Sequence, residues 1–302
     1  MNADLFATVL DCGGRPLVLD RPRVVGILNV TPDSFSDGGR HATVEAAVAH
    51  GLRLIEEGAD MLDIGGESTR PGAEEVALEE ELRRVIPVIE QLAARTTRPL
   101  AIDTSKPQVM RAAVAAGAGM INDVYGLRRD GALDAVAELG VPVCLMHMLG
   151  EPRVMQEAPH YADVVGEVHR FLADRLFACE LAGIDKRKVM VDPGFGFGKT
   201  LEHNLALLRA LQTFADLGSG VYVGLSRKSM IGALTGRTDP TGRAAGSAAA
   251  ALIAVQRGAR MVRVHDVTVT VDALAVWEAV KAGDVAPRRD DRPAAPRWPD
   301  DD

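Results

Sequence analysis

The fold is decided by one stretch of the chain, which reads Lys188-Val189-Met190-Val191-Asp192-Pro193-Gly194-Phe195-Gly196-Phe197-Gly198-Lys199-Thr200. Its short apolar run, Val189 to Val191, is typical of a strand that is buried on both sides. The strand delivers the carboxylate of Asp192 at its end, and Pro193 then stops it by removing a backbone donor. Three glycines at alternate positions allow the backbone to approach a ligand closely. A buried strand followed by an acid and a glycine-rich loop predicts a ligand-binding site.

This glycine-rich loop does not match the P-loop of nucleotide-binding proteins. Counting back from Gly198, Lys199 and Thr200, the P-loop pattern requires a glycine at position 193, where this chain has Pro193. We therefore exclude the binding of nucleoside triphosphates through this motif.

The same unit, a buried strand followed by a helix, recurs along the chain. Short apolar runs that predict strands lie at residues 24–28, 61–64, 100–102, 120–121, 141–146, 189–191, 221–225 and 261–262. Strands that alternate with helices predict a parallel sheet, and eight such units in roughly 250 residues predict a closed (β/α)8 barrel. An open doubly wound sheet is the alternative, but no G-x-G-x-x-G fingerprint follows the first strand.

The segments around these units complete the predicted domain. Thr8 to Asp20 contains turn residues between two apolar runs, which predicts a hairpin that closes one end of the barrel. We therefore assign residues 1–283 to a single barrel with an N-terminal hairpin at 1–22. Residues 284–302 are polar and rich in proline, and we expect a disordered tail. Thr43 is the expected N-cap of the first helix.

Composition excludes several classes of protein. The 302 residues are 47% hydrophobic and 25% charged, as in ordinary soluble domains. A net charge of −8 without a basic face argues against nucleic-acid binding. The longest small-apolar run, 244–255, is far shorter than a membrane span. Three widely spaced cysteines favour a reducing compartment, so we expect a cytoplasmic protein that binds neither nucleic acid nor membrane.

In a barrel of this kind, the carboxyl ends of the strands form one ring, and active sites lie there. The polar and ligand-facing candidates on this ring are Asn29, Thr69, Arg70, Asp103, Asn122, Met146, Asp192, Lys228, Arg263 and His265. A single Asn or Asp after a strand is usually a turn former, and Asp123 and Asp266 are open to that interpretation. Ser105 is open to a role as a helix cap, and His147 to a structural role.

The ring divides chemically into two halves. Two carboxylates, an amide and a lysine can recognise a flat heterocycle, because Asp accepts from amino groups and ring N–H groups, whereas Lys donates to a carbonyl or ring nitrogen. Arg70, Arg263 and His265 suit an anion such as diphosphate, and Asn29 offers an uncharged oxygen to Mg²⁺. The chain contains no H-E-x-x-H or C-x-x-C motif, so a catalytic zinc site is not expected.

At these residues the chain resembles the bacterial dihydropteroate synthases. The resemblance begins with the segment from Gly26 to Gly39, continues through the strand ends in the family's order, and covers about Val24 to Lys281. Its other matching segments are 65–72, 102–107, 121–124, 192–199, 226–228 and 263–266. The resemblance implies a (β/α)8 barrel that condenses 6-hydroxymethyl-7,8-dihydropterin diphosphate with p-aminobenzoate and releases diphosphate, in folate synthesis.

The resemblance also assigns roles to individual residues. The pterin would be bound by Asp103, Asn122, Asp192 and Lys228, with Met146 in the same pocket. The diphosphate and its Mg²⁺ would be held by Asn29, Arg263 and His265, assisted by Arg70. The p-aminobenzoate site would consist of Phe35, Thr69, Pro71, Phe197 and Ser229. The expected catalytic set is Asp103, Asp192, Lys228, Arg263 and His265, and a homodimer is also implied.

These assignments favour a reaction in which the carbon–oxygen bond breaks before the amine attacks. Asp103 and Asp192 would stabilise the cation left on the pterin methylene, while Mg²⁺, Arg263 and His265 would stabilise the departing diphosphate. A pterin-binding methyltransferase is the nearest rival function, but it needs no diphosphate ligands. A non-catalytic pterin-binding paralogue is a second rival; it would have degenerate loops, and both loops are complete here.

Overall fold

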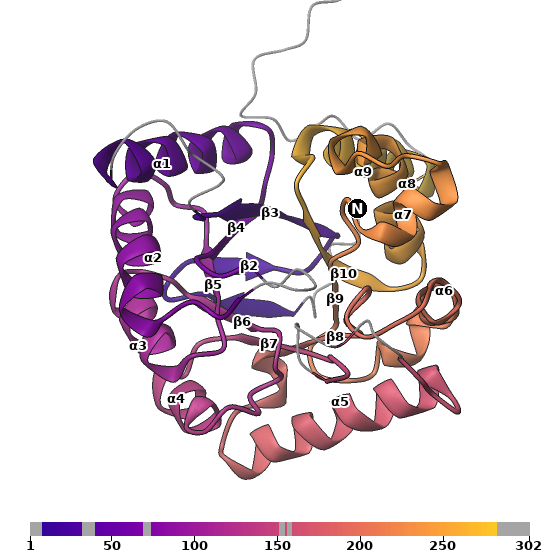
Figure 1. Cartoon of the computed structure of the whole chain (residues 1–302), viewed down its shortest axis with the longest axis horizontal. Coiled ribbons are helices and arrows are strands. Elements are labelled where there is room, and N and C mark those ends of the chain that lie inside the picture. The colour runs from indigo at the N-terminus through magenta and orange to yellow at the C-terminus, as the bar shows by residue number, and fades with distance from the viewer. Residues whose placement is uncertain (1–7, 32–39, 69–73, 151–154, 156–158, 283–302) are drawn as a thin grey trace, which may run out of the picture.

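Parallel strands form a closed barrel with helices around it (Figure 1). The computed structural model describes residues 8–31, 40–68, 74–150, 155 and 159–282. Within these residues the barrel has eight strands, in the order β10-β3-β4-β5-β6-β7-β8-β9. Their bounds are β3 Arg23–Asn29, β4 Met61–Gly65, β5 Leu100–Asp103, β6 Met120–Asp123, β7 Val143–Met146, β8 Val189–Asp192, β9 Val221–Val223 and β10 Ala259–Val264. The barrel predicted from the repeated units is confirmed.

The helices surround the barrel (Figure 1) and pack apolar side chains against its outer face. They are α1 Arg40–Glu56, α2 Leu78–Ala93, α3 Pro107–Ala115, α4 Ala132–Leu139, α5 Val164–Leu181, α6 Leu201–Arg209, α7 Ser229–Thr235, α8 Ala244–Gln256 and α9 Val267–Ala282. Short 3-10 turns lie at η2 Lys186–Lys188, η3 Leu211–Phe214 and η4 Pro240–Arg243.

The predicted helix cap at Thr43 is wrong, and Ser105, for which the sequence leaves open a role as a helix cap, is not a cap. The helix α1 begins at Arg40, so Thr43 lies inside it; a good capping residue is a local signal, and the residues before it can extend the helix. The N-cap of α3 is Lys106 rather than Ser105, and no side chain caps this helix. Pro107 occupies the first turn of α3, where its missing N–H leaves no hydrogen bond unmade.

The lower layer of the barrel interior is apolar. Each strand contributes one buried side chain to it, and these are Val25, Met61, Ala101, Met120, Cys144, Met190, Tyr222 and Met261. Successive side chains of a strand point to opposite faces, so the residue two positions further along points inward again, one layer higher. This alternation determines which residues can line the site.

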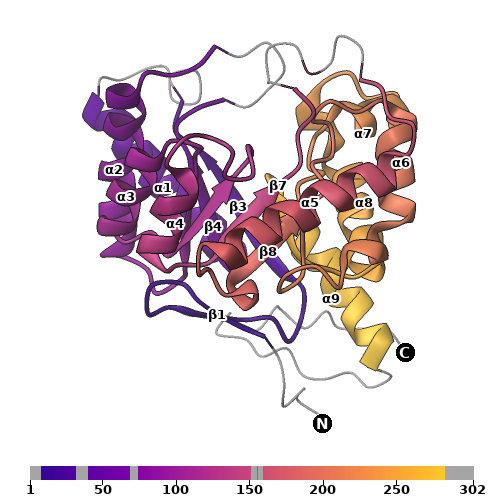
Figure 2. The same ribbon diagram turned by 90° about the horizontal axis from the view of Figure 1, so that it is seen from below.

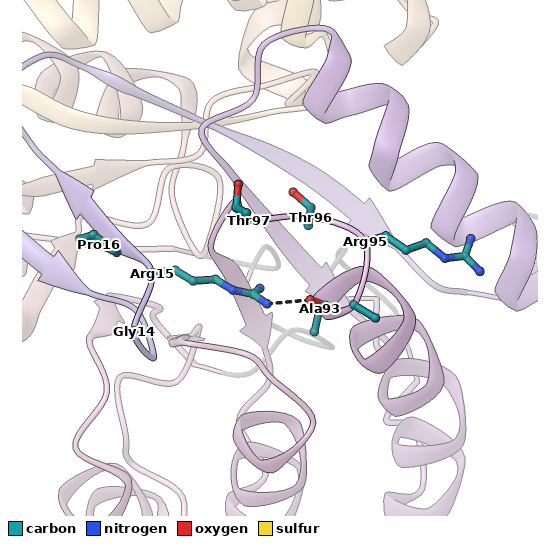
Figure 3. Close-up of a pocket in the computed structure, with 8 residues that line it drawn as sticks. Gly14, Arg15, Pro16, Ala93, Arg95, Thr96 and Thr97 are labelled. Atoms are coloured by element: carbon teal, nitrogen blue, oxygen red, sulfur yellow. Dashed lines mark hydrogen bonds between the residues drawn. The ribbon is translucent and has the colours of Figure 1, made fainter. Parts of the chain in front are cut away.

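A two-stranded hairpin covers the lower end of the barrel, as predicted (Figure 2). The strands β1 (Val9–Asp11) and β2 (Pro16–Val18) pair antiparallel and bury four apolar side chains on the lower layer: Leu10, Cys12, Leu17 and Leu19. Arg15, in the turn, donates from Nη2 to the carbonyl oxygen of Ala93 at 2.8 Å, which ties the hairpin to the end of α2 (Figure 3). The predicted tail at 284–302 lies outside the described residues.

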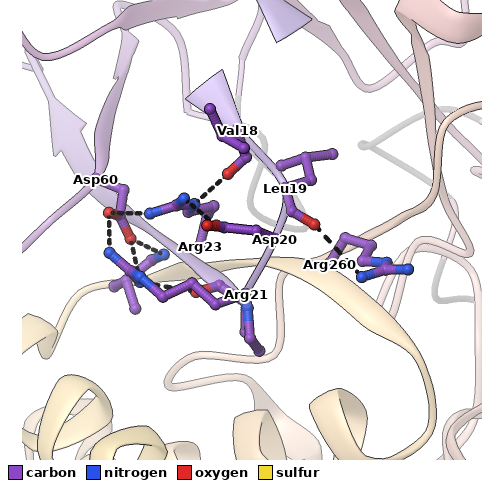
Figure 4. Close-up of polar contacts among 9 residues, drawn as sticks. Val18, Leu19, Asp20, Arg21, Arg23, Asp60 and Arg260 are labelled. Atoms are coloured by element: carbon purple, nitrogen blue, oxygen red, sulfur yellow. Dashed lines mark hydrogen bonds and ion pairs between the residues drawn. The ribbon is translucent and has the colours of Figure 1, made fainter. Parts of the chain in front are cut away.

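Asp60, directly before β4, joins the hairpin to the barrel (Figure 4). Its Oδ1 accepts from Arg21 at 2.6 Å and from Arg23 at 3.2 Å. Its Oδ2 accepts from Arg21 at 3.1 Å and from the backbone N–H of Val24 at 3.0 Å. Both oxygens of this buried carboxylate are therefore satisfied, which is the condition for a buried charge to be tolerated.

The contact between the hairpin and the barrel gives a first testable prediction. A Cβ added at Gly119 would lie 2.1 Å from the carbonyl oxygen of Cys12, so Gly119→Ala must displace the hairpin. We expect a loss of about 1–3 kcal/mol of stability, measured by chemical denaturation. Gly242→Ala is the matched control, because its nearest neighbour would be a flexible arginine carbon at 3.9 Å. Equal stability of the two variants would contradict the packing described here.

Candidate active site

The polar residues of the site form the layer directly above the apolar one. Five of them lie two positions beyond a residue of that lower layer: Asp63, Asp103, Asn122, Asp192 and Arg263. Neighbouring strands align two of them directly, since Asp103 pairs with Asn122. Met146 pairs with Asp192 in the same manner. The strand register therefore brings the predicted residues among them to one end of the barrel, together with Asp63.

Arg263 is held between two carboxylates. Its Nε donates to Oδ2 of Asp63 at 2.5 Å, and its Nη2 donates to Oδ2 of Asp103 at 2.8 Å. The same Asp63 oxygen accepts from Nδ2 of Asn122 at 2.9 Å. The strands β4, β5, β6 and β10 thus meet through one charged network, in which two of the three guanidinium nitrogens donate to carboxylates.

Burial makes Asp103 the most perturbed acid of this network. Desolvation raises its pKa to about 7; Arg263 opposes this shift, while Asp63 and Glu81 add to it. For Arg263, desolvation is outweighed by the two carboxylates, which hold its pKa above the ordinary value. Arg263 therefore keeps its charge, while Asp103 changes its ionisation close to neutral pH.

Asp192 and Lys228 form the second charged group, next to the glycine-rich loop. Oδ1 of Asp192 accepts from the N–H of Gly194 at 2.7 Å. Lys228 donates to the carbonyl oxygen of Phe195, and its Nζ lies 4.5 Å from the centre of the Phe197 ring. Burial raises the pKa of Asp192 and lowers that of Lys228 to about 8, although Asp192 partly offsets the latter shift. A lysine of this pKa can change its charge within the working pH range.

The segment that carries Lys228 is fixed by an unusual backbone conformation. Arg227 adopts a φ of 59°, a left-handed conformation that is uncommon outside glycine. Its side chain pairs with Asp266 at 2.6 Å, and its N–H donates to Oγ of Ser247 at 2.9 Å. Asp266, which the sequence left open as a turn former, is thus an ion-pair partner. These two contacts hold the backbone next to Lys228 against Ser247 of α8 and against Asp266, directly before α9.

The structure describes some of the remaining predicted residues and not others. His265 contacts Oγ of Ser226 through its N–H at 3.1 Å and its Nδ1 at 3.0 Å. Met146 is buried, with the half-buried Phe197 packed against its cluster. Asn29 ends β3 and is half-buried, while Ser229 is exposed at the start of α7. Four predicted ligand residues lie outside the described residues: Phe35, Thr69, Arg70 and Pro71.

The structure also settles the roles of Asp123 and His147. Asp123 is a turn former, since its carboxylate accepts from the N–H groups of Tyr125 at 2.8 Å and Leu127 at 2.7 Å. His147 is a structural histidine, buried 2.9 Å from Nζ of Lys199. Burial, reinforced by Lys199, lowers the pKa of His147 to about 2, so this ring stays neutral.

Sequence reasoning missed two features of the site. One is Asp63, which is fully buried within β4. The other is an ion-pair network just beyond the carboxyl ends of β4 and β5, in which Lys106 contacts Glu67 and pairs with Glu81 at 2.6 Å, and Glu81 accepts from Thr104 at 2.6 Å. Counting two positions from Met61 would have found Asp63, whereas nothing in the spacing indicates the network.

Comparisons with known proteins agree with this geometry. The model of the family described as pterin binding enzyme matches residues 25–265. The dihydropteroate synthase of Escherichia coli is 54% identical over 266 residues, which is 88% of this chain and 94% of the relative. That of Neisseria meningitidis serogroup C is 50% identical over 276 residues, covering 90% and 97%. The chain belongs to the dihydropteroate synthase family of pterin-binding enzymes.

Solved structures of this family match the whole barrel. The dihydropteroate synthase of Xanthomonas albilineans with 4-aminobenzoic acid has a TM-score of 0.87 at 68% identity, covering 91% of this chain and 99% of that one. The structure of the same enzyme in complex with 7,8-dihydropteroate has a TM-score of 0.83 at 66% identity, with the same coverage. The family's barrel is therefore present here.

The site fits a magnesium ion that arrives with a phosphate ligand. Among the described residues, no group of three or more His, Cys, Asp or Glu side chains could hold a metal by itself. Mg²⁺ in enzymes is commonly bound by one or two protein oxygens together with substrate phosphates and water. Asn29, at the end of β3, offers one such oxygen.

No helix in the described part of the chain is long and apolar enough to cross a bilayer.

Proposed function

We propose that this chain is a dihydropteroate synthase, which joins 6-hydroxymethyl-7,8-dihydropterin diphosphate to p-aminobenzoate and yields 7,8-dihydropteroate and diphosphate. The observation that carries the proposal is the buried charged layer at the strand ends, with Arg263 between Asp63 and Asp103 and with Lys228 beside the glycine-rich loop. Two carboxylates, an amide and a lysine match the alternating donors and acceptors of a pterin. The family relationship and the ligands bound in the relatives' solved structures support the same reaction.

The charges of the layer suit a reaction that begins with cleavage of the carbon–oxygen bond. Ionised Asp103 and Asp192 stabilise positive charge that develops on the pterin, and their fixed positions need no reorganisation during the step. Lys228 and Asn122 hold the pterin ring in position for the reaction, and His265 contributes to binding of the leaving diphosphate. When bound at Asn29, Mg²⁺ would supply further neutralisation of the diphosphate charge.

The bond changes balance without a further reagent. The carbon–oxygen bond of the pterin methylene breaks, and its electron pair leaves with the diphosphate. The aniline nitrogen then forms the new carbon–nitrogen bond and loses one proton to solvent or to the departing diphosphate. Because the aniline amine is neutral at pH 7, its attack requires no strongly basic side chain.

We also infer a cytoplasmic homodimer. Its support is that all three cysteines are free, and that exposed apolar side chains lie on the neighbouring helices α8 and α9: Ile253, Val269, Val276 and Val280. Light scattering after size exclusion would give the molecular mass in solution. A monomer at high protein concentration would exclude the dimer and leave the catalytic proposal unaffected.

The test of the proposed function is a diphosphate-release assay with the purified protein. We expect release to require both pterin diphosphate and p-aminobenzoate, and to be matched by formation of 7,8-dihydropteroate. Methyl transfer to cobalamin without diphosphate release would instead identify a pterin-dependent methyltransferase. Binding of the pterin without any turnover would identify a non-catalytic paralogue.

A further inference from the structure

Two buried aspartates at the start of β4 are satisfied in different ways. Asp60 uses both carboxylate oxygens in contacts with Arg21, Arg23 and the backbone (Figure 4). Asp63 is less exposed than Asp60, yet its Oδ1 has no hydrogen-bond partner among the described residues. A buried carboxylate with one oxygen that accepts no hydrogen bond destabilises the fold. A contribution to the stability of β4 therefore does not explain why an aspartate occupies position 63.

The contacts of Asp63 determine which way round the Asn122 amide is held. A carboxylate that is paired with a guanidinium can only accept hydrogen bonds, so Asn122 must present its Nδ2 to Asp63, at 2.9 Å. The two ends of an amide are nearly equal in size, and sterics alone do not distinguish them. The Asp63 charge therefore makes Asn122 Oδ1 the end that can accept from another group.

We propose that Asp63 is a positioning residue that determines specificity, because it holds the Asn122 amide with its oxygen as the acceptor for a donor on the pterin. The inference rests on the function proposed above and adds a residue to it. A pterin presents an amino group and ring N–H groups as donors. In the corresponding lumazine, a carbonyl replaces the amino group, and it would meet the oxygen of Asn122 as a second acceptor. Asp63 thus allows the site to distinguish a pterin, which has an amino group, from the corresponding lumazine, which has a carbonyl in its place.

Arg263 locks this arrangement in place. It donates from Nε to the same Oδ2 atom of Asp63 at 2.5 Å, and its Nη2 is held by Asp103. Rotation of the Asp63 carboxylate would break the Arg263 contact, so the acceptor that faces Asn122 is fixed from a second strand. In Asp63→Asn the new amide can donate to Asn122 Oδ1, and the amide of Asn122 can then turn its nitrogen toward the ligand.

The experiment compares the binding of 6-hydroxymethylpterin and 6-hydroxymethyl-lumazine by calorimetry. We expect wild type to prefer the pterin, and Asp63→Asn to reduce this preference by about tenfold or more, since leaving one buried hydrogen bond mismatched is costly. The KM for p-aminobenzoate should stay within about twofold. Asp60→Asn is the matched control: it should lower Tm and leave the preference unchanged.

A double-mutant cycle tests whether Asp63 acts through Asn122. In the Asn122→Ala background, Asp63→Asn should change the preference by less than about twofold. An unchanged preference in folded Asp63→Asn, or a full loss in both backgrounds, would overturn the inference. Failure of wild type to bind the pterin or to form product would instead overturn the proposed function.

A measurement on wild type covers the case in which Asp63→Asn does not fold. The side-chain amide signals of Asn122, assigned by their absence in Asn122→Ala, should include one proton shifted downfield by the carboxylate. We expect that shift to persist when 6-hydroxymethylpterin is added. Loss of the shift on binding would show that the amide turns, and would refute the role of Asp63.

Discussion

Arg263→Ala is expected to lose both activity and stability. Removing the guanidinium leaves Asp63 and Asp103 buried without their cation, and breaking a buried ion pair costs about 3–5 kcal/mol. The value of kcat/KM should fall by about 10²–10³-fold, because the charge that organises the layer is absent during the reaction. Steady-state kinetics and chemical denaturation measure the two losses separately.

The pH dependence of this stability loss identifies its cause. Because Arg263 lowers the pKa of Asp103, its removal raises that pKa above about 7. A carboxyl whose pKa is higher in the folded state than in the unfolded state destabilises the fold as pH rises through the interval between the two values. This interval extends to higher pH in Arg263→Ala. The difference in unfolding free energy between wild type and the variant should therefore grow between about pH 6 and pH 8. A deficit that is independent of pH would exclude Asp103 as the cause.

Lys228→Ala is expected to have the second large effect, mainly on the pterin substrate. Lys228 contacts both the glycine-rich loop and the Phe197 ring, and it is half-buried, so truncation removes a fixed charge from the site. We expect kcat/KM for the pterin diphosphate to fall by about 10²–10³-fold while the fold is retained. A kcat/KM close to that of wild type would remove Lys228 from the site.

The pH profile gives a sharper test of the same lysine. If Asp103 must be ionised, kcat/KM rises as pH increases through about 7; if Lys228 must be protonated, it falls again above about 8. The expected profile is therefore a narrow bell with its maximum between these values. Lys228→Arg keeps the charge at all relevant pH values, so the alkaline limb should disappear in this variant. If the alkaline limb persisted in Lys228→Arg, a group other than Lys228 would be responsible for it.

The barrel could be predicted because its signal is repeated. Each strand is a short apolar run with a polar residue at its end, and eight repetitions outweigh errors at individual boundaries such as Thr43. Asp103, Asn122 and Arg263 could be identified for the same reason. In the structure Asp63 joins Asn122 to Arg263, and Arg263 in turn contacts Asp103. Their roles toward substrate remain predictions.

The remaining features depend on contacts that spacing does not encode. Asp63 follows the alternation of β4 but lies between apolar neighbours, where a polar residue gives no turn or cap signal. The pairing of Lys106 with Glu81 joins residues of two adjacent units, and the packing of these units, not the spacing in the sequence, brings them together. The left-handed backbone of Arg227 is likewise invisible in the sequence, because no glycine marks it.

The pairing of β10 with β3 determines when the barrel can close during synthesis of the chain. The first barrel strand, which begins at Arg23, pairs with a strand that begins at Ala259. A chain that emerges from the ribosome N-terminus first carries Asp63 and Asp103 for most of its synthesis before Arg263 is added. Closure of the barrel and neutralisation of its interior therefore happen in one late event. A nascent chain that stalls before β10 would have an open sheet edge at β3 and would lack the cation that pairs with Asp63 and Asp103.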